Sequence, residues 1–212
     1  MANTESDIKR IFRNPPVLTT ERLHFRAMRE SDAEDMFEYA KKEETVRYLL
    51  WPTHENAAYT RTYLSFVQEQ YKKGVFYDWA VIVRETNKMI GTGGFTKIEE
   101  KHKCAQIGYV LNPAFWNLGY GTEIAKELLS FGFNALGLHR IEAQYMPGND
   151  RSRRVMDKCG MTYEGTARQS MFVKGEYKDV ATCAILRSEY FARESEKHYD
   201  LPPESHWYDK LF

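Results

Sequence analysis

Two glycines stand where a polar turn gives way to an apolar, periodic stretch. In the run FWNLGYGTEIAKELLSFGF, residues 115–133, Gly119 and Gly121 flank Tyr120 just before the periodic part begins. Glycine lets the backbone approach a ligand closely, and the first N–H groups of a helix have no partner inside it. Such a turn could bind an anion at the helix N-terminus. An ordinary strand-to-helix turn explains the pair equally well.

Two familiar phosphate-binding loops do not fit this spacing. The P-loop needs Gly-x-x-x-x-Gly-Lys-Ser/Thr, and the dinucleotide fingerprint needs Gly-x-Gly-x-x-Gly. Thr122 and Glu123 follow Gly121, so the P-loop lysine is missing, and the third glycine of the fingerprint would fall on Ile124. Spacing alone therefore leaves the anion unidentified.

A second polar group opens another helical stretch. Asn149 and Ser152 have the spacing of a helix start, where Asn is an ordinary N-cap. Arg151, Arg153 and Arg154 crowd the first turns, where positive charge opposes the helix dipole. These arginines either meet an anionic ligand or form a solvated helix face, and the sequence leaves both readings open.

The remaining pattern predicts the scaffold that positions these residues. Strands are expected over residues 17–28, 76–84, 89–97, 104–111, 140–146, 161–173 and 177–187. Helices are expected after Ser31 and over residues 55–73, 120–136 and 149–158. This order predicts an α/β fold with a mixed sheet, in which a strand, the glycine-opened helix and a further strand form a central βαβ unit.

The chain ends differ from this core. Residues 1–16 are expected to form a loose N-terminal arm, and residues 17–190 to form one domain. Residues 191–212 form a tail in which Pro202-Pro203 argues against a continuous helix, and whose apolar end could serve docking or a homodimer contact.

Composition excludes several functions. Lysine plus arginine and aspartate plus glutamate both number 30, so a neutral chain offers nucleic acid no attractive field. The chain has three cysteines, Cys104, Cys159 and Cys183, and their spacing is typical neither of a metal site nor of a disulfide framework. No apolar run reaches the length needed to span a membrane. We expect a soluble cytoplasmic protein with no metal, no membrane contact and no nucleic-acid partner.

Short motifs then occur in a recognisable order along the chain. From the N-terminus they are LTTERLHFRAM (18–28), IGTGGF (90–95), IGYVLNP (107–113), the glycine turn, LGLHRIEA (136–143), Asn149-x-x-Ser152, KCGM (158–161) and Glu164-Gly165. With them the chain resembles the GNAT superfamily of N-acetyltransferases over roughly residues 17–190, and within it the Rim-type branch that acetylates ribosomal-protein N-termini. The family signature Arg/Gln-x-x-Gly-x-Gly/Ala falls on residues 116–121, with Trp116 replacing Arg or Gln.

The resemblance implies a fold and a cosubstrate site. It implies a mostly antiparallel sheet of about seven strands, splayed where acetyl-CoA binds, with flanking helices. The implied acetyl-CoA contacts are Tyr109, Val110, Leu111, Trp116, Asn117, Leu118, Gly119, Tyr120, Gly121, Thr122, Asn149 and Ser152. The implied catalytic residues are Ser152, as proton donor to the leaving thiolate, and Asn149. The tyrosine that many family members use for this protonation is replaced by Met156.

A general base is harder to assign. The family's usual carboxylate positions fall on Gln106 and Met171, which do not titrate, and Glu142 is either a base or part of a structural hydrogen bond. An α-amine with a pKa near 7.7–8.0 is about one-third neutral at pH 7.5, whereas a lysine-like amine needs about 4 kcal/mol to lose its proton. The acceptor is therefore expected to be a protein N-terminal α-amine, with a small amine such as an amino acid, polyamine or aminoglycoside as the alternative. A catalytically silent acyl-CoA-binding module is the rival from another class.

Overall fold

The computed structural model describes residues 6–199, with side chains described to Ser195. The helices are α1 (Asp7–Arg13), α2 (Ala33–Ala40), α3 (Glu43–Val46), α4 (Ala57–Lys73), α5 (Tyr120–Asn134), α6 (Asp150–Lys158) and α7 (Arg187–Tyr199). The strands are β1 (Leu18–Thr19), β2 (Leu23–Arg26), β3 (Asp78–Val83), β4 (Lys88–Glu99), β5 (Cys104–Leu111), β6 (Arg140–Tyr145), β7 (Thr162–Val173) and β8 (Glu176–Leu186). Short 3-10 turns lie at Glu30–Asp32, Glu100–His102 and Pro113–Phe115.

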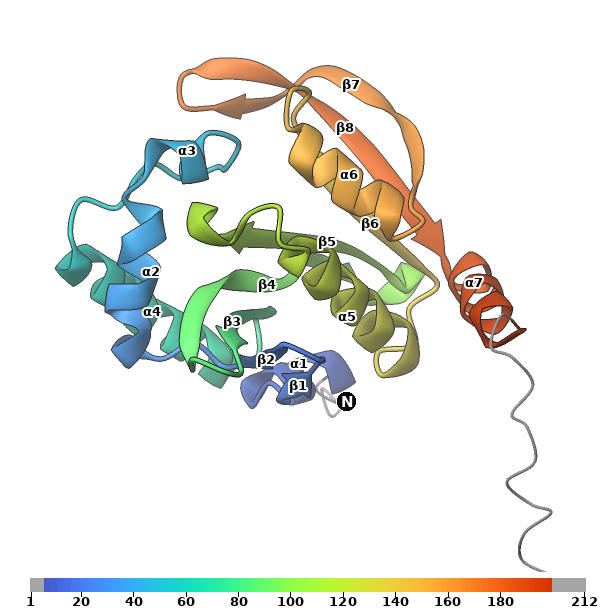
Figure 1. Cartoon of the computed structure of the whole chain (residues 1–212), viewed down its shortest axis with the longest axis horizontal. Helices are drawn as coiled ribbons and strands as arrows, with labels where there is room; N and C mark the ends of the chain where they lie inside the picture. The colour runs from blue at the N-terminus through green and yellow to red at the C-terminus, as the bar shows by residue number, and fades with distance from the viewer. Residues whose placement is uncertain (1–5, 200–212) are drawn as a thin grey trace, which may run out of the picture.

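The strands form one mixed sheet of eight strands in the order β1-β2-β3-β4-β5-β6-β8-β7 (Figure 1). Among the strands of residues 6–199, only β5 and β6 pair in parallel, and α5 connects them across one face of the sheet. All other neighbouring strands are antiparallel. The predicted α/β class and the central βαβ unit are confirmed.

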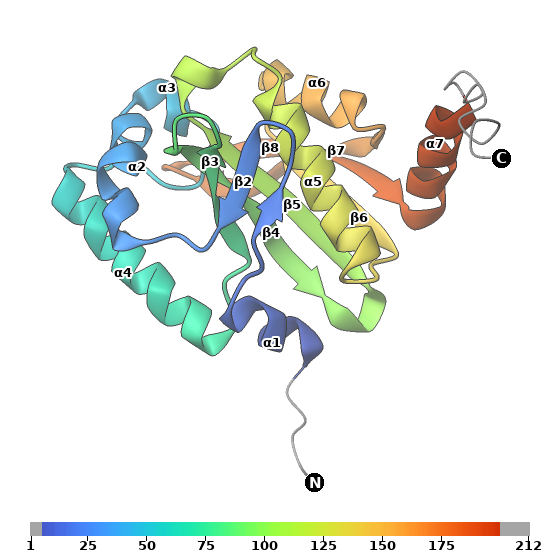
Figure 2. The same cartoon turned by 60° about the horizontal axis from the view of Figure 1, so that its bottom comes forward.

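Helices cover the sheet on both faces, and each face has its own core (Figure 2). Under α5, apolar side chains from the helix pack on Trp79, Val81 and Ile141. Under α2 and α4, helix residues pack on Ala80 and Ile82 from the opposite face of β3. The side chains of β3 therefore contribute to both cores, because successive residues of a strand point to opposite faces of the sheet.

The two long helices begin in different ways. Asn56 caps α4 by accepting a hydrogen bond from the Tyr59 N–H at 2.8 Å, and Gly74 ends that helix with a φ of +66°. The N-cap of α5 is Gly119, which has no side chain to accept a bond from the first turn. An uncapped start leaves N–H donors of α5 facing outward.

The N-terminal segments differ from the sequence expectation. Residues 7–13, expected to be part of a loose arm, form α1, because Phe12 is fully buried against Trp79 and its neighbours. The single strand expected over 17–28 is a hairpin of β1 and β2, closed by a 2.9 Å bond from the Thr20 N–H to the Leu23 carbonyl. This hairpin makes the sheet one strand wider than expected.

The C-terminal segment begins as helix α7, which extends across the expected domain boundary at residue 190. Tyr190 packs on Phe133 of α5 with ring centroids 5.0 Å apart. The predicted apolar tail end, with Trp207 and Phe212, lies outside the described residues.

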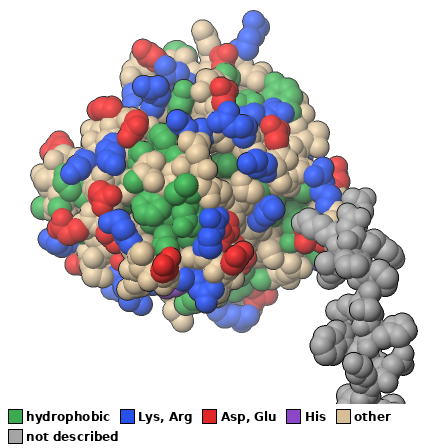
Figure 3. Space-filling view, in the orientation of Figure 1, with side chains coloured by type: hydrophobic (Ala, Val, Ile, Leu, Met, Phe, Trp, Pro, Cys, Tyr) green, Lys and Arg blue, Asp and Glu red, His purple; other side chains and the backbone are tan. Residues whose placement is uncertain are grey.

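The visible surface carries both charge signs in a mixed pattern (Figure 3). This matches the equal numbers of acidic and basic residues in the chain. Within residues 6–199, none of the helices has the length and apolarity needed to cross a bilayer.

Candidate active site

The central parallel strand pair separates halfway along its length. β5 pairs with β6 only from Cys104 to Ile107, opposite Arg140 to Ala143. β5 nevertheless continues to Leu111, held by β4 on its other side. The edge of residues 109–111 that faces β6 is therefore left out of the ladder, which is the splay that the resemblance implied.

A cavity of about 910 Å³ opens at this splay. The edge of β5, the start of α5, the start of α6 and the segment 44–51 all contribute to its walls. The predicted site residues that line it are Tyr109, Val110, Leu111, Trp116, Asn117, Gly119, Gly121, Thr122, Asn149 and Ser152. The predicted residues thus come from three separate segments of the chain, 109–111, 116–122 and 149–152, and meet in one place.

The glycine turn forms one end of the cavity. Gly119 has a φ of +87°, a conformation that glycine adopts without strain. A Cβ on Gly121 would lie 3.3 Å from a Val155 methyl carbon, so this glycine also allows α5 and α6 to approach closely. Since no side chain caps α5, its first-turn N–H groups and the positive end of its dipole are available to an anion.

Two residues of the predicted set do not line the cavity. Leu118 is exposed, and its carbonyl accepts a 3.0 Å bond from Arg22. The Tyr120 ring lies 4.2 Å below the same guanidinium. Any role of Leu118 and Tyr120 at the anion site would therefore come from their backbone, and that role stays a prediction.

Trp116 holds a positive charge beside the glycine turn. Its indole N–H donates to the Leu111 carbonyl at 3.0 Å, and the Arg151 guanidinium lies 4.4 Å above its ring. Arg151 and Arg154 line the cavity, whereas Arg153 bonds to Asp157 at 2.8 Å and to the Tyr145 hydroxyl at 3.2 Å. Contact of Arg151 and Arg154 with an anionic ligand therefore stays a prediction, whereas Arg153 is held by contacts within the protein.

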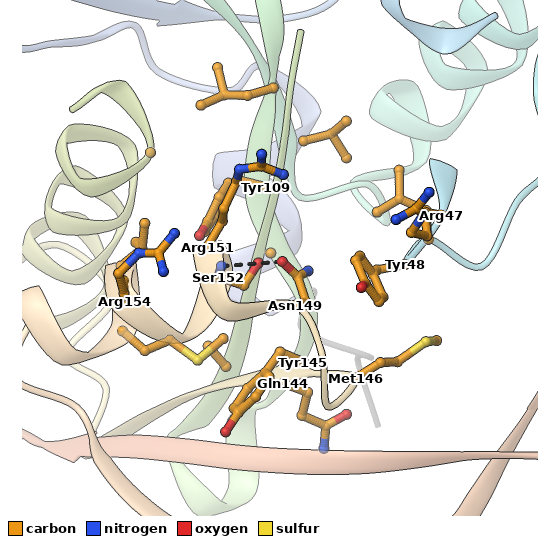
Figure 4. A pocket seen from close by; sticks show the side chains of 18 of the residues that line it. Arg47, Tyr48, Tyr109, Gln144, Tyr145, Met146, Asn149, Arg151, Ser152 and Arg154 are labelled. Carbon is orange, nitrogen blue, oxygen red and sulfur yellow. Dashed lines mark hydrogen bonds between the residues drawn. The ribbon is translucent and has the colours of Figure 1, made fainter. Parts of the chain in front are cut away.

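Asn149 and Ser152 meet at the start of α6 (Figure 4). The Asn149 side-chain oxygen accepts a 3.3 Å bond from the Ser152 N–H, which is the capping role predicted for it. Both side chains also line the cavity, so capping and contact with a ligand are compatible.

The side chain of Tyr109 was assigned no role by the sequence, which indicated only backbone contacts there. Its buried hydroxyl has no hydrogen-bond partner in the described part of the chain. Burial raises the pKa of Tyr109 well above its ordinary value, and the neighbouring Ser152 hydroxyl opposes part of that rise. The Tyr109 hydroxyl therefore lies near Ser152, between β5 and α6, without a hydrogen bond to it.

The opposite end of the cavity is covered by the segment 44–51. The Tyr48 hydroxyl donates to the Gly148 carbonyl at 2.9 Å, and Lys174 at the tip of the β7–β8 hairpin donates to the Val46 carbonyl at 2.6 Å. Arg47 and Tyr48 face Asn149 and Ser152 from across the cavity (Figure 4). No local sequence pattern indicates these contacts, because the partners lie 100 and 128 residues apart.

Comparison with known proteins identifies the family. A model described as "Acetyltransferase (GNAT) domain" matches residues 22–162, which include the splay and the glycine turn. The chain belongs to the GNAT acetyltransferases. It is an acetyl-CoA-dependent N-acetyltransferase.

Relatives of similar length support this assignment. "Uncharacterized N-acetyltransferase YoaA" of Bacillus subtilis is 34% identical over 176 residues, covering 81% of this chain and 97% of the relative. "Uncharacterized N-acetyltransferase p20" of Bacillus licheniformis is 31% identical, covering 82% and 97%. The crystal structure of a GNAT-family acetyltransferase from Bacillus anthracis is 31% identical, with a TM-score of 0.73 over 82% of this chain and all of that one.

Among the described residues, two carboxylates line the cavity, Glu44 and Asp150, and neither stands at a position where the family usually carries its base. Gln106 and Met171 line the cavity, and neither titrates. Glu142 is not among the lining residues, and its carboxylate lies 3.4 Å from Arg140, which also pairs with Glu164. Of the two interpretations of Glu142, the structure supports the structural one.

Proposed function

We propose that the protein transfers the acetyl group of acetyl-CoA to an α-amine, with a protein N-terminus as the leading acceptor. The observation that carries this proposal is the unpaired edge of residues 109–111 beside the uncapped start of α5. The strand edge suits an extended arm that carries amide groups, and the uncapped helix start suits a pyrophosphate. A single ligand that has both groups is the cosubstrate of this family.

The cosubstrate would lie mainly against backbone. The N–H groups of Gly119, Tyr120 and Gly121 would bind the pyrophosphate, with the Arg151 guanidinium over Trp116 adding positive charge. The edge of Tyr109, Val110 and Leu111 would pair with the pantetheine arm as an added strand pairs with a sheet, apart from the Leu111 carbonyl, which already accepts the Trp116 indole N–H. Asn149 would contact the same arm while it caps α6.

Acetyl-CoA supplies an activated acyl group, and the protein would supply donors around it. A backbone N–H at the splay would hold the oxyanion that develops on the carbonyl. Ser152 would donate a proton to the departing thiolate, with the Tyr109 hydroxyl beside it. Cys159 follows the last turn of α6 and is buried, so a covalent relay through its thiol is not part of the proposal.

The acceptor end favours a neutral or mildly basic amine. Its described lining includes Gln106, Gln144 and Met171, and the segment 44–51 adds one charge of each sign, Glu44 and Arg47. A polyamine carries several positive charges, of which Glu44 would balance one while Arg47 would repel the others. An α-amine brings less charge and is partly neutral near pH 7.5.

Distant relatives point to both kinds of acceptor. The "[Ribosomal protein uS5]-alanine N-acetyltransferase" of Escherichia coli is 24% identical over 182 residues. The "Spermidine N(1)-acetyltransferase" of Vibrio cholerae is 27% identical over 113 residues. The first match spans 82% of this chain and the second 53%, which supports the protein N-terminus as leading acceptor and a small amine as second candidate.

A panel assay tests the proposal against a silent acyl-CoA-binding module. The protein is incubated with acetyl-CoA and, separately, with N-terminal peptides, amino acids, spermidine and an aminoglycoside, while free thiol is followed. We expect thiol release that depends on an α-amine. Binding of acetyl-CoA without amine-dependent thiol release would contradict the proposed transfer and support the silent acyl-CoA-binding module. Thiol release with spermidine alone would make a polyamine the acceptor in place of an α-amine.

A further inference from the structure

The positive charges that line the cavity are divided between its two ends. In the described part of the chain, the lining cations are Arg47, Arg151, Arg154 and Lys158. The last three belong to α6, whereas Arg47 belongs to the segment 44–51 and faces Ser152 from the opposite wall (Figure 4). Within residues 6–199, Arg47 is therefore the one lining cation of the acceptor end.

The backbone on both sides of Arg47 is anchored to other parts of the chain. The Val46 carbonyl accepts a 2.6 Å bond from the Lys174 ammonium, and the Tyr48 hydroxyl donates to the Gly148 carbonyl at 2.9 Å. Val46 is buried, whereas the Arg47 side chain is exposed at the cavity. A side chain with anchored neighbours has less freedom to lose when it binds a ligand. The backbone of Arg47 is thus positioned before a substrate arrives.

The Arg47 guanidinium has no partner of its own. It makes no hydrogen bond, ion pair or aromatic contact with any residue that the structure describes. Glu44 lines the same cavity, yet it forms no ion pair with Arg47. The Lys174 ammonium beside it bonds to a carbonyl, and no described carboxylate pairs with it. Two cations without a paired carboxylate therefore lie next to each other, and the planar donors of a guanidinium match the two oxygens of a carboxylate.

The cosubstrate would not supply the missing anion. Its pyrophosphate would lie at the glycine turn, where the Arg151 guanidinium over Trp116 adds positive charge. Arg47 faces Asn149 and Ser152, where the proposed function places the pantetheine arm and the thioester, which carry no charge. The attacking amine is neutral or positive, so it gains nothing from Arg47. An anion near Arg47 would therefore belong to another part of the acceptor.

We propose that the acceptor carries a carboxylate close to its α-amine, and that Arg47 binds this carboxylate. This inference rests on the proposed function and narrows its acceptor to acidic α-amines. The carboxylate belongs to an aspartate or glutamate at the second residue of a protein N-terminus, or it is the α-carboxylate of a free amino acid. Arg47 is thus a specificity-determining residue that positions the acceptor and takes no part in proton transfer.

A double-mutant cycle between enzyme and acceptor tests this contact. The value of kcat/KM is measured by thiol release for two peptides that differ only at the second residue, Asp or Asn. We expect the wild type to prefer the Asp peptide by about five- to ten-fold, and Arg47→Gln to lose this preference with an unchanged Kd for acetyl-CoA. Arg47→Glu should reverse the preference and favour a peptide with Lys at that position.

A matched variant and a second acceptor pair complete the design. Arg168→Glu makes the same change of net charge at an exposed residue outside the cavity lining, and it should keep the wild-type preference. Glycine and glycinamide differ only in the α-carboxylate. An Arg47-dependent preference for glycine would identify a free amino acid as the source of the carboxylate, and one for the Asp peptide would identify a protein N-terminus.

Three results would overturn the inference. The first is a wild type that prefers neither the Asp peptide nor glycine over its uncharged counterpart. The second is an Arg47→Gln variant that lowers kcat/KM equally for both members of each pair, because a merely structural role would act in this way. The third is a preference that survives in Arg47→Gln. In each case α-amines are still acetylated and the proposed function stands. If only spermidine releases thiol, the proposed function fails, and the inference falls with it.

Discussion

At the proposed cosubstrate end of the cavity, the groups that would face acetyl-CoA are mostly backbone atoms of β5 and α5. At the acceptor end they are side chains from segment 44–51, the strand faces and the β7–β8 hairpin. Backbone recognition depends on local conformation, which glycines and helix starts specify. Side-chain recognition depends on which distant segments meet. The first end should therefore be sensitive to changes in shape and charge at the glycine turn, and the second to changes in single side chains.

The largest effect is expected at the glycine turn. Gly121→Asp places a carboxylate in the first turn of α5 at the cavity wall, where it would repel the pyrophosphate and crowd Val155. We expect the Kd for acetyl-CoA to rise by about 100-fold or more, measured by calorimetry. Gly137→Asp is the matched control, because it adds the same charge beyond the other end of α5, where a Cβ meets nothing within 4 Å. If both variants bound acetyl-CoA equally well, the proposal that backbone N–H groups of the glycine turn bind the pyrophosphate would be contradicted.

The next effect separates chemistry from binding. Ser152→Ala removes the proposed proton donor but keeps the backbone N–H that Asn149 caps. Turnover should fall by about 10- to 100-fold with the Kd for acetyl-CoA unchanged. Ser130→Ala, on α5 and outside the cavity lining, should behave like the wild type. Unchanged turnover in Ser152→Ala would remove Ser152 from its role and leave the Tyr109 hydroxyl as the donor to test.

A smaller effect is expected from the charge that Trp116 positions. Arg151→Ala should raise the Kd for acetyl-CoA by about 10-fold at low salt, and less at high salt, because screening weakens a charge at an exposed site. Arg153→Ala is the control on the same helix, since Arg153 bonds to Asp157 and Tyr145. If both variants weakened binding equally, the arginines would act only through net charge.

The smallest effect concerns the cover of the acceptor end. Tyr48→Phe deletes the 2.9 Å bond to the Gly148 carbonyl and keeps the ring. One neutral hydrogen bond is worth about 1 kcal/mol, so the KM for the acceptor should rise by about five-fold while acetyl-CoA binding is unchanged. The exposed Tyr177, changed to Phe, provides the control. A shift in acetyl-CoA binding instead would mean that the two ends are not independent.

The same contrast explains what the sequence could predict. The succession of strands and helices along the chain, the βαβ unit and the glycine turn could be predicted, because periodicity and helix-start signals are local. The hairpin at Thr20 and the buried Phe12 of α1 were missed because they depend on tertiary packing rather than local pattern. The Tyr109 side chain was missed because its burial requires α6 to pack against β5.

A peptide that carries both a free α-amine and an internal lysine tests the central claim most directly. It is incubated with the protein and acetyl-CoA, and the acetylated nitrogen is mapped by mass spectrometry while thiol release is followed. Our account predicts one acetyl group, on the α-amine, with an equal amount of thiol released. Acetylation of the lysine, or binding of acetyl-CoA with no transfer to either amine, would contradict it.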